Sequence, residues 1–229
     1  MSRAAKLLLL CVVLTVILYA IPFGGLIIWP IMLFATLAHE MGHGVAALTC
    51  GGEFHQFRLW ADGSGVANTG GLSAPWMGAV VSAGGLVGPA LAAMVLFALG
   101  RSASWSRRAL YGASAAFILA DVLVVRNTFG LFYVGALGLL TAWLARNVEA
   151  RTAQLVVVFM AMQLSLSVFS TSDYLFTDVA RTSGGTMPSD VAQMANVLGG
   201  PYWLWGLVVG AFSVGVLVVG LRVFLRGAR

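Results

Sequence analysis

The sequence predicts an all-α polytopic membrane protein with about six to seven transmembrane helices and a short β-hairpin after the second. Hydrophobic residues make up 60% of the 229 residues and charged residues only 9%, whereas about a quarter of a soluble domain is charged. The apolar residues form runs close to the roughly 20 residues that a spanning helix needs. One polar segment, residues 51–71, interrupts these runs early in the chain.

Seven apolar runs account for the predicted helices, and with the chain length they predict a single membrane-embedded domain over residues 1–229. The first run follows Arg3 and Lys6, as in a signal peptide, but no small-residue cleavage site follows it, so we expect a retained helix. The fourth and fifth runs are separated only by residues 126–128, which begin with Arg126-Asn127, so the predicted number of spanning helices is six or seven. The runs are residues 7–21, 26–48, 76–99, 110–125, 129–144, 154–169 and 203–224.

Two polar segments break the apolar pattern. In residues 51–71, aromatic and apolar residues flank the turn signal Asp62-Gly63-Ser64-Gly65, which predicts a β-hairpin. Backbone groups at membrane depth need internal partners, so this hairpin must lie at the interface or among helices. In residues 171–202, Pro188-Ser189-Asp190 and Gly199-Gly200-Pro201 are the start and stop signals of a short helix.

The net charge of +5 is carried by basic residues between the apolar runs. This placement favours contact with anionic lipid headgroups, and we expect no nucleic-acid partner. Arg3 and Lys6 place the N-terminus in the cytoplasm by the positive-inside rule. The later arginines fall on the opposite face if all seven runs span the membrane, so the sequence leaves the orientation open.

The motif His39-Glu40-Met41-Gly42-His43 lies inside the second apolar run. On a helix, His39 and His43 share one face, and Glu40, three residues before His43, shares it too. Two neutral imidazoles can bind Zn²⁺ and leave positions for a third ligand and a water, whose proton Glu40 can accept. Such polar residues are costly in lipid, so a functional role is favoured over a cluster of histidines that only packs helices.

The stretch from His39 to Pro89 resembles the site-2 protease group of intramembrane zinc metallopeptidases, and most resembles its compact bacterial branch without a PDZ domain. The shared features are the His-Glu-x-x-His helix, Gly51-Gly52 with the predicted hairpin, and the run from Gly84 to Pro89. The later segment from residue 172 to residue 206 also resembles the end of that branch.

This resemblance implies a multi-pass protein of the bacterial plasma membrane that cleaves a peptide bond in or near a transmembrane segment of a membrane-protein substrate. It implies Zn²⁺ as the cofactor, His39 and His43 as ligands, and Glu40 as the general base. It also implies that the hairpin binds the unwound substrate as an added strand.

The third zinc ligand is open among three aspartates. Site-2 proteases usually supply it from a Leu-Asp-Gly setting, but the only Asp-Gly here is Asp62-Gly63, in the predicted hairpin. Asp173 matches a recurring aspartate of the compact branch and is our predicted ligand. Asp121 lies deep in an apolar run, where an acid is rarely idle. Asp190 opens the predicted short helix, where capping is the more ordinary role.

Two other functions compete with proteolysis. One is a non-catalytic membrane adaptor that retains the protease fold, and the other is a metal-ion transporter. Glu40 favours the enzyme, because a purely structural site needs no base, and the sequence lacks the repeated halves typical of transporters. The third histidine, His55, is expected to be exposed on the hairpin. The sequence determines neither the substrate's identity nor the oligomeric state.

Overall fold

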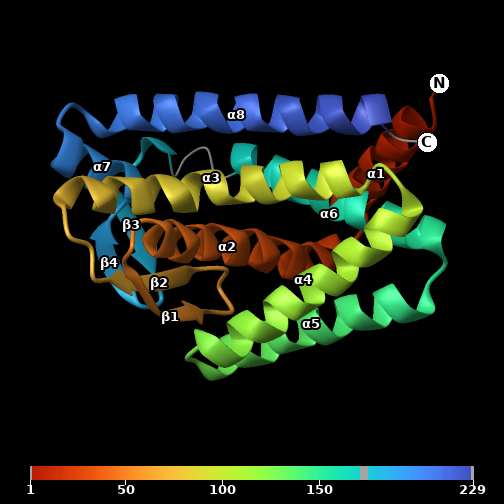
Figure 1. Ribbon diagram of the computed structural model, residues 1–229, viewed down its shortest axis with the longest axis horizontal. Helices are drawn as coiled ribbons and strands as arrows, with labels where there is room; N and C mark the ends of the chain where they lie inside the picture. Colours follow the sequence, from red (N-terminus) through yellow and green to blue (C-terminus); the bar gives the residue numbers. More distant parts are fainter. Residues whose placement is uncertain (1, 171–174, 228–229) are drawn as a thin grey trace.

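The computed structural model, which describes residues 2–170 and 175–227, is a bundle of long helices with two small β-hairpins at one end (Figure 1). Six helices of this described part are long and apolar enough to cross a membrane, namely all the long helices except α4. The predicted polytopic all-α fold is therefore confirmed. In chain order the elements are α1 (Arg3–Ala20), α2 (Gly24–Thr49), β1 (Glu53–Leu59), β2 (Gly65–Gly70), α3 (Pro75–Leu99), α4 (Ala103–Leu123), α5 (Thr128–Asn147), α6 (Ala150–Ser170), β3 (Val179–Thr182), β4 (Gly185–Pro188), α7 (Asp190–Leu198) and α8 (Tyr202–Gly227).

The uncertain fourth and fifth runs form a helical hairpin, α4 and α5, which lie side by side in Figure 1. The Ser114 hydroxyl donates to the Gly138 carbonyl across the pair at 2.8 Å. A Cβ on Gly138 would lie 2.8 Å from Ile118 Cγ1, so this glycine allows the two helices to approach closely. The polar residues of α4, including Arg107 and Arg108, make this helix less apolar than the six helices that could cross a membrane.

The predicted hairpin of residues 51–71 is confirmed. β1 and β2 pair antiparallel from Glu53↔Gly70 to Leu59↔Gly65, with an irregularity in register between Phe54 and Gln56. Phe57 and Leu59 are fully buried against the α2 residues Leu33 and Leu37. The hairpin is therefore inserted among helices, as the need to satisfy its backbone groups requires.

The outer edge of β1 is covered by the short connection between α4 and α5. Phe57 N donates to Val124 O at 2.7 Å, and Arg126 N donates to Phe57 O at 2.9 Å. The Asn127 side chain accepts from Leu59 N at 3.1 Å and donates to Leu59 O at 2.6 Å. This connection therefore covers the outer edge of β1, and within the described residues no strand or connection covers the outer edge of its partner β2.

The second polar segment holds a hairpin that the sequence analysis did not predict, β3 and β4, followed by the predicted short helix, α7. Ser189 caps the start of α7 and Gly199 follows its end. The turn of the second hairpin contacts the turn of the first: Ser183 Oγ donates to Asp62 Oδ2 at 2.6 Å, and Ser183 N donates to Ser64 Oγ at 3.1 Å. The Ser-Gly pair at this turn is a signal that could have revealed the hairpin.

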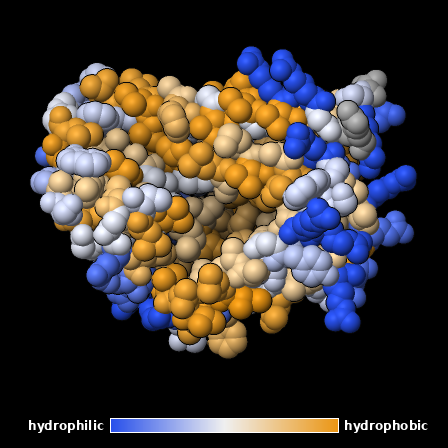
Figure 2. Space-filling model, in the orientation of Figure 1, coloured by the Kyte–Doolittle hydropathy of each residue, from blue (hydrophilic) through white to orange (hydrophobic). Residues whose placement is uncertain are grey.

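The surface of the bundle matches a membrane environment. Figure 2 shows hydrophobic side chains across the middle of the face in view, which is hollowed at its centre. Hydrophilic side chains gather toward the ends, most densely at the end that carries both termini (Figures 1 and 2). This distribution is expected of a membrane protein, whose apolar middle faces the lipid core and whose polar ends face the two aqueous boundaries.

Candidate metal centre

Close packing of α2 against α3 places the two histidines of the motif. The Cα of Gly42 lies so near Gly84 O that a Cβ there would collide with it, and a Cβ on Gly88 would lie 2.7 Å from Ala38 O. Gly85 lies directly against the His43 ring, where a side chain would displace the imidazole. Small residues at a helix interface allow such close approach in membranes. Packing therefore explains these glycines, and one consequence is that His43 lies against α3.

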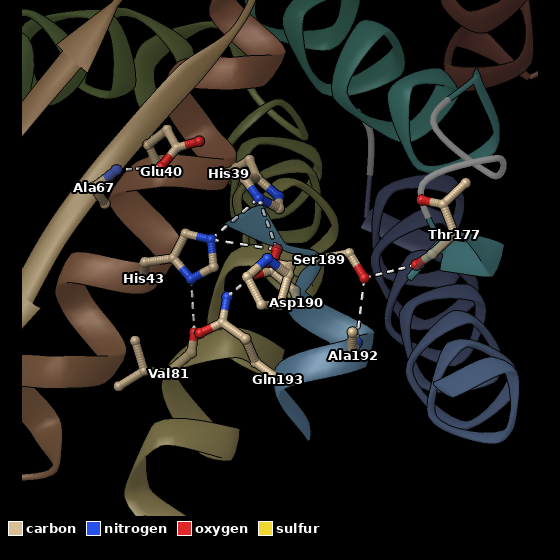
Figure 3. A network of polar contacts seen from close by, with 11 residues as sticks. His39, Glu40, His43, Ala67, Val81, Thr177, Ser189, Asp190, Ala192 and Gln193 are labelled. Atoms are coloured by element: carbon tan, nitrogen blue, oxygen red, sulfur yellow. Dashed lines mark hydrogen bonds and ion pairs between the residues drawn. The ribbon is translucent and has the colours of Figure 1, made fainter. Parts of the chain in front are cut away.

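Three ligand atoms from α2 and α7 meet in a small triangle (Figure 3). His39 Nε2 lies 3.1 Å from His43 Nε2, and Asp190 Oδ2 lies 3.2 Å from the first and 3.4 Å from the second. Zinc–ligand bonds of about 2.0–2.1 Å at tetrahedral angles separate neighbouring ligand atoms by about 3.3 Å. The triangle therefore matches one face of a zinc tetrahedron.

The hydrogen bonds around the triangle also fit a metal ion. His43 Nδ1 donates to Val81 O at 2.8 Å, which fixes the ring and leaves the Nε2 lone pair for a ligand. Asp190 Oδ2 is buried, and no hydrogen bond from the described residues satisfies it. A buried carboxylate oxygen without a donor is costly, and a bound cation removes that cost.

Asp190 reaches the histidines because its neighbour caps the helix. The Ser189 side chain accepts from Ala192 N at 3.2 Å and donates to Thr177 O at 2.6 Å. The expectation that Asp190 itself serves as the cap is therefore wrong. Burial would raise the pKa of the Asp190 carboxyl, but the charges of the adjacent His43 and His39 outweigh it and hold that pKa well below its usual range. This direction favours the carboxylate form, which a zinc ligand needs.

The other candidate ligands lie elsewhere. Asp173, the predicted third ligand, lies outside the described residues. Asp121 is on α4, where its Oδ2 faces Gly135 of α5 across the helical hairpin. Within the described ranges, the group of histidine, cysteine and acidic residues close enough to hold a metal consists of His39, His43 and Asp190. His55 is exposed on β1, as predicted, and lies 3.5 Å from Glu53.

Glu40 is buried and bonded to the hairpin. Its Oε2 accepts from Ala67 N of β2 at 2.6 Å (Figure 3), and the side chain is sheltered between α2 and this strand. A Cβ on Gly65 would lie 2.8 Å from Glu40 Cγ and 2.8 Å from Thr36 Cγ2, so only glycine fits there. One carboxylate oxygen is thus fixed by a backbone donor. Sequence reasoning could not locate that donor, because a backbone amide carries no residue-specific signal.

A cavity of about 440 Å³ reaches His39 and Glu40 from within the helical bundle. Its polar lining comes from these two residues, from both hairpins and from hydroxyl and amide side chains of the helices, including Asp62, Thr182 and Gln163. The rest of the wall is mostly aliphatic, and most of it comes from α2, α3 and α6. It includes Ile28, Ile31, Leu86, Leu166 and Val168. The candidate metal centre therefore lies beside a largely apolar space.

A family model described as Peptidase M50B-like matches residues 7–220, nearly the whole length from α1 to α8. The chain belongs to the M50B-like peptidase family. The resemblance to site-2 proteases that the motif predicted is thereby confirmed, and the M50B-like chain is compact, as expected of that branch. Neither the curated proteins nor the solved structures contain a match to it.

Proposed function

We propose that this M50B-like protein is a zinc-dependent intramembrane endopeptidase of the bacterial plasma membrane, which hydrolyses a peptide bond in or near a transmembrane segment of a membrane-protein substrate. The observation that carries the proposal is the triangle of His39 Nε2, His43 Nε2 and Asp190 Oδ2, with the Glu40 carboxylate beside the same cavity. A transport site or a structural site has no need of that base.

His39, His43 and Asp190 hold the metal in this proposal, and Asp190 takes the place that the sequence analysis gave to Asp173. A Zn²⁺ ion held by these residues would polarise the scissile carbonyl and lower the pKa of a water. Val81 O fixes the ring of His43, and the close approach of α3 keeps that ring in place. These three protein ligands would leave the ion accessible to the reacting groups.

Glu40 moves the proton. Its Oε2 is held by Ala67 N, so the carboxylate keeps one orientation while its second oxygen accepts the proton of the attacking water. The same group then delivers that proton to the leaving amine as the peptide bond breaks. Burial of Glu40 between α2 and β2 restricts the water that reaches it.

The open edge of β2 is the proposed substrate-binding edge. Phe57 and Leu59 direct their backbone groups toward the α4–α5 connection. In an antiparallel pair their partners, Ala67 and Gly65, then direct theirs away from β1. Ala67 N is bonded to Glu40, so a substrate would pair through Ala67 O and the backbone groups of Gly65. A substrate segment unwound into an extended strand would pair along that edge, next to Glu40.

Glu40→Gln tests the proposal, because it keeps size and polarity but removes the basic carboxylate. Loss of a general base lowers turnover by about 10²–10⁴-fold, and zinc content should not change. The assay is cleavage of single-span substrates in liposomes at matched zinc content. Glu53→Gln is the matched control, since Glu53 is an exposed acid of β1 and its substitution should leave turnover at the wild-type value.

Two results would contradict the proposal. Equal turnover in Glu40→Gln and wild type would show that the cleavage comes from another site or a contaminant. If wild type and Glu40→Gln both cut nothing and both rescue the same cellular phenotype, the chain acts as a non-catalytic adaptor.

A further inference from the structure

The cavity beside the metal centre is bordered by both hairpins. Gly65 at the start of β2 and Arg181 of β3 both line it. The two hairpins meet at their turns, where Ser183 Oγ donates to Asp62 Oδ2 at 2.6 Å. An extended segment that lies along β2 in this cavity therefore comes within reach of β3.

The backbone groups of Arg181 point away from β4. In an antiparallel pair, hydrogen-bonded pairs of residues alternate with pairs whose backbone groups point outward. Ser189 N donates to Asp178 O at 2.9 Å, and the pair of Arg181 with Thr186 lies three steps further along the same ladder, so it is an outward-facing pair. Pro188, which has no N–H to donate, falls in another outward-facing pair, as this alternation requires. Within the described residues no other strand covers the outer edge of β3, so this edge is open at Arg181.

Arg181 also carries a charge that is not already engaged within the cavity. Among the acids that line the cavity, Glu40 accepts from Ala67 N and Asp62 accepts from Ser183. By contrast, no hydrogen bond or ion pair joins the exposed Arg181 guanidinium to another of the described residues. A guanidinium is always ionised, and its fork of N–H donors matches a carboxylate. The cavity therefore offers a binding group for an acidic side chain.

The distance along β3 sets where that acid would lie in a substrate. Asp178 is bonded to Ser189, which directly precedes the candidate ligand Asp190. Arg181 follows Asp178 by three residues, and at about 3.4 Å per residue this separation is about 10 Å. An extended substrate advances by the same length per residue. Arg181 is therefore about three residues from the bond that the metal centre would cleave.

We propose that Arg181 is a specificity-determining residue, which binds the carboxylate of an aspartate or glutamate about three residues from the scissile bond. This role rests on the proposed function and identifies the substrate class of the same site. The outward-facing backbone groups of Arg181 hold the substrate main chain, while its guanidinium binds the acidic side chain. Substrates with an acid at this position are therefore cleaved in preference to those with a basic residue there.

A charge scan of a model substrate tests this preference. The probe is a synthetic single-span peptide, uncharged around its cleavage site, into which one glutamate or one lysine is placed at successive positions. In liposomes, wild type should cleave the best glutamate peptide with a kcat/KM roughly tenfold above that of the lysine peptide of the same position. Arg181→Glu should reverse the preference, because its carboxylate attracts the lysine. Arg58→Glu is the matched control, since Arg58 is exposed on β1 and does not line the cavity, and it should keep the wild-type preference.

Binding measurements separate the role of Arg181 from the proposed function. In a Glu40→Gln background, fluorescence anisotropy of the labelled peptides should show the same preference for glutamate, and adding Arg181→Glu should reverse it. If no form cleaves any peptide but this binding preference is present, the proposed function fails and Arg181 remains an acid-binding residue.

Three results would overturn the role of Arg181. The first is cleavage or binding that is equal for glutamate and lysine peptides at every position in wild type. The second is a preference for glutamate that survives in Arg181→Glu or is lost equally in Arg58→Glu. The third is an equal loss of binding for every peptide in Arg181→Glu, which would indicate a structural role.

Discussion

Replacing Asp190 with asparagine removes the charge of the acid that closes the ligand triangle while keeping its size. Its Oδ2 lies 3.2 Å and 3.4 Å from the Nε2 atoms of His39 and His43, so it contributes one full ligand. Structural zinc binding of about 10–16 kcal/mol shared over four ligands is about 2.5–4 kcal/mol for each. Asp190→Asn should therefore weaken zinc binding roughly 10²–10³-fold.

Competition with a chelator of known zinc affinity measures this change in the purified protein. Asp178→Asn is the matched control, because Asp178 is an exposed acid in the same polar segment and should leave zinc affinity unaltered. Helical circular dichroism of both variants checks that the bundle is intact. Zinc retention equal to wild type in Asp190→Asn, with loss in Asp173→Asn or Asp121→Asn, would refute the assignment of Asp190.

Two further predictions concern the hairpins. Gly65→Ala should displace the Glu40 side chain, since the added Cβ would lie 2.8 Å from Glu40 Cγ. Turnover should fall roughly 10²-fold, while zinc is retained. Gly78→Ala is the control: its added Cβ meets nothing within 4 Å, so its turnover should match wild type. Hydrogen bonds from Ser183 and Ser64 hold the pKa of Asp62 below its ordinary value. The ionised carboxylate therefore stabilises the contact between the hairpin turns at any pH above the ordinary pKa of aspartate, and this stabilisation is lost as the pH falls through the lowered pKa. Hydrogen exchange of residues 179–188 should therefore accelerate in acid, and an equal acid response in Asp62→Asn would contradict this reasoning.

The sequence by itself determined the features that depend on local pattern. Long apolar runs with few charges predict membrane helices because lipid offers no partner to polar groups. Asp62-Gly63 between apolar residues predicts the first hairpin through turn chemistry. The spacing of His39 and His43 places both rings on one face of any helix. The sequence motif alone therefore predicts the pair of candidate metal ligands and the position of Glu40 beside them.

Only the tertiary structure decided which distant groups meet these residues. Asp190 lies beside the histidines because Ser189 takes the capping role and α7 packs against α3, and no local periodicity encodes such a contact. The bond between Glu40 and Ala67 N and the covering of β1 by residues 124–127 involve backbone groups, which every residue carries alike.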